Sequence, residues 1–410
     1  MALIVKKFGG SSVATPEKLK AVAQRVLRER TAGDQTVVVV SAMGDTTDDL
    51  IELAQNITDQ TYGREMDMLL STGEQVTIAL LAMAFEKLGC PAVSLTGAQA
   101  GVATNDIYNK AKIRTVDPKR VLAELEAGKI VVVAGFQGLA PNGDITTLGR
   151  GGSDATGVAL AGALKADACE IYTDVDGIYS ADPRVVKNAR RMKEITYNEM
   201  LEMARLGAGV MQSRSVELGK HYGVPIHVRS TFSQEPGTFI REEYTMEEHE
   251  FIIRGVTHDT NVAKIAVLGV PNVPGVAYKI FSALAKATVD VDMIVQSIRN
   301  TEQNINDIVF TISKPDLPRA RKVVEQFSQE MGVLGVVVED NVAKVSVVGA
   351  GMLGSPGIAA TMFGALADAG VNIEVISTSE ISISCLIPDD KVKEAVNAIH
   401  KRFFPEADAK

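Results

Sequence analysis

The rest of this chain is arranged around one stretch, which reads Thr146-Thr147-Leu148-Gly149-Arg150-Gly151-Gly152-Ser153-Asp154-Ala155-Thr156-Gly157. An apolar β-branched run lies upstream of it, and a helical pattern of small residues follows it. Glycines let main-chain N–H groups approach a ligand, and a helix start adds unpaired donors and a positive dipole end. Arg150 would add a planar fork for a carboxylate or phosphate. The pattern indicates an anion cradle; the alternative is a glycine loop in which Ser153 or Asp154 simply caps the helix.

Composition limits the class of protein. The 410 residues predict two or three domains, and 46% hydrophobic with 23% charged residues and no Trp is typical of a soluble α/β protein. The formal net charge of -9 argues against a nucleic-acid partner. Cys90, Cys169 and Cys385 lie far apart, which favours reduced thiols in a cytoplasmic protein. We recognise neither a secretory signal nor an apolar run of membrane-spanning length, and therefore expect no membrane.

Strand and helix patterns alternate in the first two thirds of the chain. The predicted strands cover residues 3–7, 36–40, 91–95, 130–134 and 168–173, and the predicted helices between them cover 16–30, 62–88 and 118–127. This order predicts a mostly parallel sheet with helices on both faces. Ligands bind such sheets beyond the carboxyl ends of the strands. Polar and glycine-rich clusters lie there, at residues 7–12, 41–48, 147–154 and 173–184.

The last third contains an internal repeat. Residues 274–294 align without gaps on residues 356–376, and each copy carries the pattern strand, helix, strand, strand, helix. The polar, acidic segment 241–250 before the repeat is the best boundary candidate. Residues 349–354 match a dinucleotide-binding glycine pattern, which we reject because too little chain follows and the sister repeat lacks it.

Three groups of residues could carry phosphate or amine chemistry. Lys7 with the glycines after it could hold a transferring phosphoryl group, although it could also be a surface lysine before a turn. Asp174, Asp176 and Asp182 with Arg184 could serve a magnesium nucleotide or be ordinary turn residues. Glu74 could recognise an amine or be a solvated helix glutamate. The glycine-lysine pairs of the chain precede neither Ser nor Thr, so no Walker A loop is present.

Several motifs taken together resemble the aspartokinase family. They occur in order over essentially the whole chain, at residues 7–13, 40–47, 71–74, 135–138, 147–154, 172–177 and 376–380. The resemblance implies a three-layer amino-acid-kinase domain with a mostly parallel central sheet, followed by two α+β ACT modules of ferredoxin-like type. The implied domains are residues 1–245, residues 262–341, and residues 250–261 plus 342–410. The segment 251–257 would supply the opening strand of the second module.

The resemblance also implies an activity. Family members transfer the ATP γ-phosphate to the side-chain carboxylate of L-aspartate, giving 4-phospho-L-aspartate, the first step toward lysine, threonine and methionine. Lys7 and Asp154 would be catalytic. The residues implied for aspartate are Ser41, Thr47, Glu74, Arg150 and Ser153. Those implied for ATP are Gly9, Gly10, Thr173, Asp174, Tyr179, Asp182 and Arg184. No protein metal site is expected, because Mg²⁺ would arrive with ATP.

The repeat would bind an effector. The implied effector residues are Asn272, Asp290, Gln296, Ser355, Asn372, Thr378, Ser379 and Glu380, and the expected inhibitors are L-lysine, L-threonine or both. The resemblance further implies a homodimer or tetramer, and Met246 could start a shorter regulatory polypeptide.

One position of the kinase part departs from the family pattern, and in the effector half Asn272 and Asp290 stand where relatives commonly have Asp and Asn. Relatives usually have a lysine, associated with the nucleotide phosphate, where this chain has Gly209; Arg184 or Arg214 could compensate. Two rival functions remain. A kinase acting on glutamate or an acylated glutamate is disfavoured by residues 71–74 and the double repeat, and a catalytically silent amino-acid sensor is favoured only by Gly209.

Overall fold

The computed structural model describes residues 2–244, 252–300, 304–352 and 354–405. Its contacts divide the chain into two compact units. The first unit comprises Met1–Tyr179, Arg191–Ala204 and Gly209–Glu248. The second comprises Ser180–Arg190, Arg205–Ala208 and His249–Lys410. Met246, the candidate internal start, and residue 251 lie outside the described residues.

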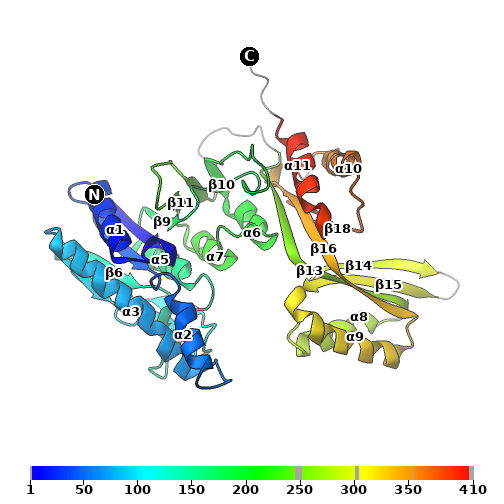
Figure 1. The fold of residues 1–410 in the computed structure, drawn as a ribbon, viewed down its shortest axis with the longest axis horizontal. Helices are drawn as coiled ribbons and strands as arrows, with labels where there is room; N and C mark the ends of the chain where they lie inside the picture. The colour runs from blue at the N-terminus through cyan, green and yellow to red at the C-terminus, as the bar shows by residue number, and fades with distance from the viewer. Residues whose placement is uncertain (1, 245–251, 301–303, 353, 406–410) are drawn as a thin grey trace, which may run out of the picture. The chain divides into compact units, whose positions relative to one another are not determined.

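The first unit contains an eight-stranded sheet in the order β10-β12-β11-β9-β1-β2-β6-β3. Figure 1 labels β6, β9, β10 and β11 of this sheet. Neighbouring strands run parallel, except that β11 pairs antiparallel with β12. The strands are β1 (Leu3–Phe8), β2 (Gln35–Val40), β3 (Ala92–Leu95), β6 (Ile130–Ala134), β9 (Ala168–Thr173), β10 (Glu194–Thr196), β11 (Ile226–Ser230) and β12 (Thr238–Arg241). The valine runs of β2 and β6 are fully buried because helices cover both faces of the sheet.

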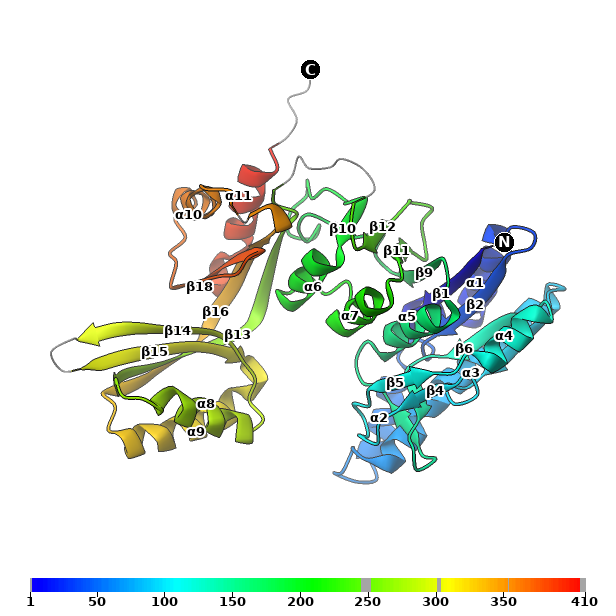
Figure 2. The same ribbon diagram turned by 180° about the vertical axis from the view of Figure 1, so that it is seen from behind.

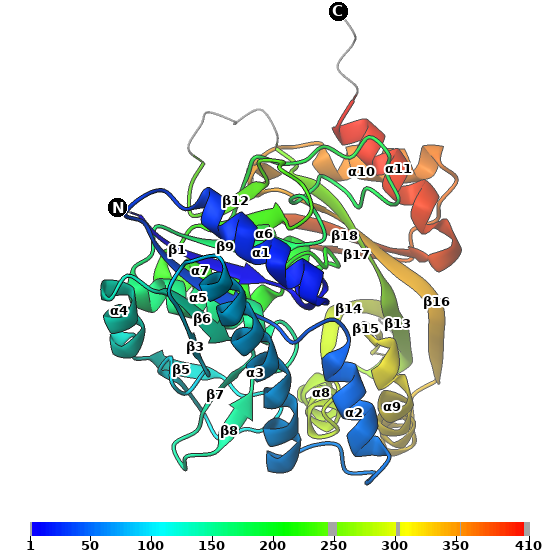
Figure 3. The same cartoon turned by 60° about the vertical axis from the view of Figure 1, so that its left-hand side comes forward.

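Two helices cover one face of this sheet, as Figure 3 shows. The apolar sides of α1 (Pro16–Glu29) and α3 (Arg64–Lys87) share a core with Phe8, Val38 and Val132. The opposite face is covered by α5 (Gly152–Leu164), which packs on β1 and β9 and against α7 (Ser213–Tyr222). The remaining helices of the first unit are α2 (Thr46–Gln55), α4 (Lys119–Glu126) and α6 (Tyr197–Arg205), whose last residue belongs to the second unit. The three-layer architecture predicted from the sequence is therefore present.

One expectation about membranes needs correction. Among the described residues, α3 is long and apolar enough to cross a membrane by length and composition, although we expected no such run. Half of its apolar window is buried in the protein, and it carries the buried carboxylates of Asp67 and Glu74. Because it packs on β3 and β6, α3 is the core helix of the first unit.

A second, four-stranded sheet was not predicted. Its order is β5-β4-β7-β8, formed by β4 (Val102–Thr104), β5 (Ile113–Val116), β7 (Gln137–Leu139) and β8 (Ile145–Thr147). Strands of three or four residues are too short to show a periodic pattern. The last strand of this small sheet, β8, ends at Thr147, so the glycine-rich stretch begins within this strand and continues directly after it.

The second unit contains a six-stranded antiparallel sheet in the order β14-β15-β13-β16-β18-β17. Figure 2 shows the helix pair α8 and α9 beside one half and the pair α10 and α11 beside the other. The elements are β13 (Gly255–Pro271), α8 (Val276–Lys286), β14 (Val291–Asn300), β15 (Ile305–Ser313), α9 (Leu317–Met331), β16 (Gly335–Val348), α10 (Ile358–Asp368), β17 (Val375–Thr378), β18 (Ser382–Pro388) and α11 (Val392–Phe403). Each helix pair has its own core, so the repeat forms two modules.

Two long strands, β13 and β16, each run through both modules. The start of β13, at Gly255, pairs with Val348 at the end of β16, whereas the later part of β13 pairs with the start of β16. The expected strand exchange is therefore present from Gly255 onward. Gly349, the first glycine of the rejected dinucleotide pattern, has a structural role: a Cβ there would lie 2.1 Å from the carbonyl oxygen of Ile252.

Equivalent lysines of the repeat link the modules reciprocally. Lys264 of β13 forms an ion pair with Glu374 of the second repeat, and Lys344 of β16 forms one with Asp292 of the first repeat. Lys344 is only 3% exposed, and burying a lysine is costly unless it is paired. The modules therefore contact each other as a pseudo-symmetric pair.

Candidate active site

Lys7 lies near the carboxyl end of β1, between β2 and β9, where it pairs in register with Val39 and Ile171. Its Nζ lies 2.6 Å from Oδ1 of Asp154, and Lys7 is only 8% exposed. The helix that carries Asp154 can approach because Gly157 faces Lys7; a Cβ at Gly157 would lie 3.3 Å from the Cβ of Lys7. The structure thus brings the two predicted catalytic residues together as a buried ion pair.

The glycine loop after β1 contacts the loop after β2. Gly9 donates its N–H to the carbonyl oxygen of Tyr172, and the N–H of Gly44 donates to the carbonyl oxygen of Gly10 at 3.1 Å. A Cβ on Gly10 would lie 3.0 Å from the carbonyl oxygen of Ala42. The close approach of the two loops therefore favours glycine at position 10, because a side chain there would crowd the main chain of the second loop.

Glu74 faces the same loop from α3. Its Oε1 accepts the N–H of Ala42 at 3.0 Å, while Oε2 is buried and has no hydrogen-bond partner among the described residues. Gly73 allows this contact, because a Cβ there would lie 2.8 Å from the Cβ of Ala42. Ser41, directly after β2, and Thr47, in the first turn of α2, are half-buried at the same edge of the sheet. Glu74 is therefore a buried carboxylate with one free acceptor oxygen.

The pKa of Glu74 is strongly perturbed. Burial raises it to about 7, even though backbone N–H groups stabilise the charged form. A cation placed at Oε2 would stabilise the carboxylate and replace the solvation that burial removes. A carboxylate in this state is suited to binding an ammonium group.

Two glycines of the glycine-rich cradle adopt backbone conformations that other residues rarely adopt. Gly149 and Gly151 have φ angles of 74° and 70°, in the left-handed region. The helix α5 begins at Gly152 with Gly151 as its N-cap, so Ser153 and Asp154 lie in the first turn and neither is the capping residue. The alternative interpretation of these two residues as simple caps is therefore wrong.

Two cradle residues differ in exposure. Ser153 is buried beneath Gly135, the residue after β6, where a Cβ would lie 2.8 Å from the Cβ of Ser153. Arg150 is exposed in the loop between β8 and α5. The first turn of α5 thus reaches the carboxyl edge of the main sheet, while Arg150 is accessible to a ligand from solvent.

Sequence reasoning missed Asp67, which is fully buried in α3. Its carboxylate accepts hydrogen bonds from the N–H of Asn109, at 3.0 and 3.1 Å, and from the N–H of Thr147, at 2.9 Å. The Thr147 hydroxyl adds a bond of 2.5 Å. Asp67 therefore anchors the start of the cradle to the core helix. An acidic residue among apolar neighbours on a helix was the signal that could have identified it.

We expect Asp67→Asn to destabilise the protein by about 2 kcal/mol, because an amide NH₂ would face donors that now meet a carboxylate oxygen. The affinity of the cradle for an anionic ligand should fall as well, because Thr147 leads into the cradle. Urea unfolding and ligand titration measure the two effects. Glu65→Gln, at an exposed site of the same helix, is the control; equal stability of the two variants would contradict the anchoring role.

The structure divides the predicted nucleotide residues between the units. Thr173, Asp174 and Tyr179 belong to the first unit, whereas Asp182 and Arg184 belong to the second. The Thr173 hydroxyl donates to Asp174 at 2.9 Å, and the Tyr179 hydroxyl donates to Asp176 at 2.8 Å. These residues therefore do not form one site within a single unit.

The pKa values of Tyr179 and Asp182 are shifted by their surroundings. Burial, and then the hydrogen bond to Asp176, raise the pKa of Tyr179. The Arg184 guanidinium lies 2.7 Å from the Asp182 carboxylate, and hydrogen bonding to Arg184 lowers the pKa of Asp182. Tyr179 is therefore hydrogen-bonded to Asp176, and Asp182 forms an ion pair with Arg184.

Arg214 does not replace the missing lysine. Its guanidinium donates to the carbonyl oxygens of Leu148 at 2.8 Å and of Ala111 at 2.9 Å. Burial lowers its pKa. Arg214 therefore holds the cradle from the side of α7, which corrects the expectation that it could compensate for Gly209.

The predicted effector residues lie at loops and strand ends of the two modules. Asn272 follows β13 and exchanges hydrogen bonds with Asn304, and Asp290 and Gln296 are exposed at β14. In this chain β15 separates β13 from β14, so Asn272 does not neighbour Gln296 in the sheet. In the second module, Ser355 donates to the carbonyl oxygen of Gly351. The remaining predicted residues are exposed around β17, namely Asn372, Thr378, Ser379 and Glu380.

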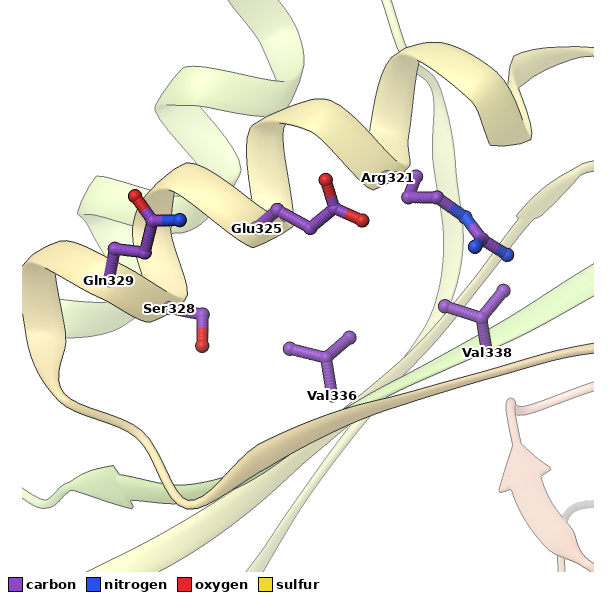
Figure 4. Close-up of a pocket in the computed structure, with 6 residues that line it drawn as sticks. All are labelled: Arg321, Glu325, Ser328, Gln329, Val336 and Val338. Atoms are coloured by element: carbon purple, nitrogen blue, oxygen red, sulfur yellow. The ribbon is translucent and has the colours of Figure 1, made fainter.

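The first module also contains an open hollow of about 450 Å³. Figure 4 shows that it is lined by α9 and the start of β16, with Arg321, Glu325, Ser328, Gln329, Val336 and Val338. The predicted effector residues do not line it.

Comparison with known proteins decides the family. The amino acid kinase family model matches residues 2–230, and the ACT domain model matches residues 265–327 and 345–403. The chain is 51% identical over 407 residues to an aspartokinase of Mycolicibacterium smegmatis, a match that covers 98% of this chain and 96% of the relative. The chain belongs to the aspartokinase family. It is accordingly a kinase, as the resemblance implied.

Solved aspartokinases share the fold. E. coli aspartokinase III in complex with aspartate and ADP, in the R-state, is 25% identical with a TM-score of 0.81; the match covers 98% of this chain and 100% of that chain. The same enzyme in complex with lysine and aspartate, in the T-state, is 26% identical with a TM-score of 0.78 and covers 98% and 99%. The predicted fold class, a kinase domain followed by ACT modules, is confirmed.

Proposed function

We propose that the chain transfers the γ-phosphate of ATP to the side-chain carboxylate of L-aspartate, giving 4-phospho-L-aspartate and ADP. The observation that carries this proposal is Glu74, a buried carboxylate with one unpartnered oxygen, at the same sheet edge as the Lys7–Asp154 ion pair. An amino-acid substrate needs a partner for its ammonium group, and a transferring phosphoryl group needs a fixed cation. A site that has both the Glu74 carboxylate and the Lys7 cation therefore fits an amino-acid kinase.

The reaction needs positioning more than proton transfer. An oxygen of the ionised aspartate side chain attacks the γ-phosphorus, the bond from phosphorus to the β,γ-bridging oxygen breaks, and ADP leaves with that electron pair. Because the nucleophile is already ionised, no general base is required. Lys7 would stabilise charge on the transferring group, and the loop of Gly9 and Gly10 would lie beside the phosphates. Asp154 would orient Lys7, and Mg²⁺ would enter with ATP as part of the substrate.

The remaining site roles are proposed on the same geometry. Glu74 would bind the ammonium group of aspartate, and the exposed fork of Arg150 its α-carboxylate. Ser41, Thr47 and Ser153, all at this sheet edge, would complete the substrate site. ATP would contact Thr173, Asp174, Tyr179, Asp182 and Arg184.

A hydroxamate assay tests the proposed reaction against its rivals. Acyl phosphate formed from ATP and aspartate reacts with hydroxylamine to give a coloured hydroxamate. We expect product with aspartate and little with glutamate or N-acetylglutamate. Product with only the latter acids would support the rival kinase, and no product with any acid would support the silent sensor.

Gly209→Lys should lower the KM for ATP or raise kcat, by about 3- to 10-fold, because a cation would be restored near the nucleotide phosphates. The position can accept the change, since a Cβ at Gly209 meets no atom within 4 Å. Initial rates at varied ATP measure the effect, with Gly209→Gln as the uncharged control. Unchanged kinetics would show that the site does not need this lysine.

We further propose feedback inhibition by L-lysine, L-threonine or both at the ACT modules. The complex of E. coli aspartokinase III with lysine and aspartate supports this for a relative of the same fold. The predicted effector residues at Asn272, Asp290 and Gln296 and around β17 would supply the site. Initial rates with each amino acid at millimolar concentration test the idea, and no change with either would reject it.

Four features of organisation and location are part of the same proposal. The domains would be 1–245, 262–341, and 250–261 plus 342–410. A homodimer or tetramer is supported by β14, a strand at the sheet edge that exposes Ile294 and Ile298, and light scattering would measure the assembly size. A short product beginning at Met246 would be visible on a blot. A cytoplasmic location is supported by the free thiols of Cys90, Cys169 and Cys385.

A further inference from the structure

The segment that follows β11 lies beside the ends of two other strands of the first unit. β11 ends at Ser230 and pairs with β9, β9 pairs with β1, and all three strands run parallel. Their carboxyl ends therefore lie at one edge of the sheet, where β1 leads into the glycine loop and β9 ends at Thr173. The residues predicted for ATP follow β1 and β9, and none of them follows β11. The end of β11 is thus the part of this edge to which no role has been assigned.

Thr231, the first residue after β11, contacts the loops that follow both of the other strands. Its N–H donates to the carbonyl oxygen of Thr173 at 2.9 Å. Its hydroxyl lies 2.6 Å from the hydroxyl of Ser12, in the short turn that follows Gly9. Because Ser12 is only 1% exposed, its hydroxyl cannot turn to solvent for another partner. Loss of the Thr231 hydroxyl would therefore leave a buried polar group without a hydrogen bond.

The guanidinium of Arg25, in α1, fixes the main chain around Thr231. Its Nη1 donates to the carbonyl oxygens of Ser230, at 2.8 Å, and of Thr231, at 2.6 Å. Arg25 is buried, its Nε lies 3.1 Å from Glu29, and its guanidinium carbon lies 4.7 Å from the centre of the Tyr172 ring. An ion pair, a cation–π contact and two carbonyl groups leave this side chain little freedom. The main chain at Thr231 is therefore held in one position.

We propose that Thr231 is a positioning residue of the nucleotide site, which holds the glycine loop through Ser12 in the conformation that binds the ATP phosphates. The inference rests on the proposed function, which assigns Gly9, Gly10 and Thr173 to ATP, and it involves residues of the first unit alone. Gly9 and Gly10 have no side chains that could fix their loop by packing, so the loop depends on hydrogen bonds from its neighbours. A loop that is in its binding conformation for only part of the time binds its ligand in proportion more weakly.

The test compares Thr231→Val, which keeps the shape of the side chain but removes the hydroxyl, with Thr231→Ser, which keeps the hydroxyl. The valine variant should raise both the KM for ATP and the Kd for Mg-ATP, titrated without aspartate, roughly 3- to 10-fold, because one buried hydrogen bond no longer favours the binding conformation. The KM for aspartate should stay unchanged. The serine variant should bind Mg-ATP as the wild type does. Adding Ser12→Ala to Thr231→Val should cause no further loss, because both changes remove the same bond.

A matched control separates positioning from general destabilisation. Thr104→Val removes a hydroxyl pair of the same kind from the first unit, since the buried hydroxyls of Thr104 and Thr146 lie 2.5 Å apart in the small sheet. The control should lose stability in urea but keep its affinity for Mg-ATP. An equal loss of this affinity in Thr104→Val, or no loss in Thr231→Val, would overturn the inference. A wild-type protein that binds Mg-ATP but does not phosphorylate aspartate would instead reject the proposed function alone.

Hydrogen exchange of the wild-type protein gives a second test without substitution. Mg-ATP should slow exchange in peptides covering residues 9–13 and in peptides covering residues 229–233 together, because a hydrogen bond joins the two segments. Slower exchange in residues 9–13 with no change in residues 229–233 would refute the link, even if Thr231→Val did not fold.

Discussion

Glu74→Gln is expected to stabilise the fold and at the same time to remove substrate affinity. Burial raises the pKa of Glu74 in the folded protein from its ordinary value of 4.5 to about 7, so the fold is most stable when this carboxyl group is protonated. Stability should fall as the pH rises from the unfolded-state pKa through the folded-state pKa. Glutamine is not ionised, so the advantage of the variant should grow by on the order of 2 to 3 kcal/mol between about pH 5 and pH 8.

The loss of function has the same origin. The buried Oε2 of Glu74 is without a partner among the described residues, and the proposed partner is the ammonium group of aspartate. Without the negative charge, the KM for aspartate should rise about 100-fold or more, with a smaller effect on the KM for ATP. Urea unfolding at two pH values and initial rates at varied aspartate measure the two effects.

Glu86→Gln is the matched control, because Glu86 is exposed near the end of the same helix. It should change neither the pH dependence of stability nor the KM for aspartate. If Glu74→Gln unfolds with the pH dependence of the wild type, the carboxyl group does not titrate in the folded state as we infer. If its KM for aspartate is normal, Glu74 does not bind the amine.

Lys7→Met is expected to lower kcat by about 1,000-fold or more, because the cation that faces the transferring phosphoryl group is lost. The same change should destabilise the protein by about 3 kcal/mol, because it leaves the largely buried carboxylate of Asp154 without its partner at 2.6 Å. Single-turnover rates and urea unfolding measure the two losses separately.

Two further variants distinguish catalysis from stability. Adding Asp154→Asn to Lys7→Met should recover much of the stability without recovering turnover. Lys6→Met removes the neighbouring lysine, whose Nζ lies 2.8 Å from Glu29 and 2.5 Å from Glu170, and should cost stability while kcat stays near wild type. A Lys7→Met variant that keeps a tenth of the wild-type kcat would contradict the catalytic role of Lys7.

Local patterns were sufficient for much of the architecture. The valine runs of β2 and β6 predicted buried parallel strands because such strands are apolar on both faces. The repeat in the last third predicted two related modules, since each copy carries the same pattern of strand, helix, strand, strand and helix. The glycines of the cradle predicted a loop whose main chain can approach a ligand, and Gly149 and Gly151 adopt left-handed φ angles that glycine permits.

Local sequence patterns could not predict which residues far apart in the sequence contact each other in the fold. Lys7 could have been a surface lysine, and only the packing of α5 on β1 buries it against Asp154. Asp67 stabilises the cradle through Asn109 and Thr147, residues far along the chain whose proximity no spacing rule predicts. Arg214 was considered for the nucleotide, but it is bound to carbonyl groups of the cradle.

The sequence by itself determined which residues could do the chemistry and the order of the longer strands and helices, because charge, glycine and hydrophobic periodicity are local properties. Tertiary structure alone decided how those residues are paired and which unit they belong to. Asp182 and Arg184 lie between two segments of the first unit in sequence but belong to the second, because the apolar side chains of their neighbours Ala181 and Val186 are buried in that core. Burial, which also raises the pKa of Glu74, depends on the whole fold.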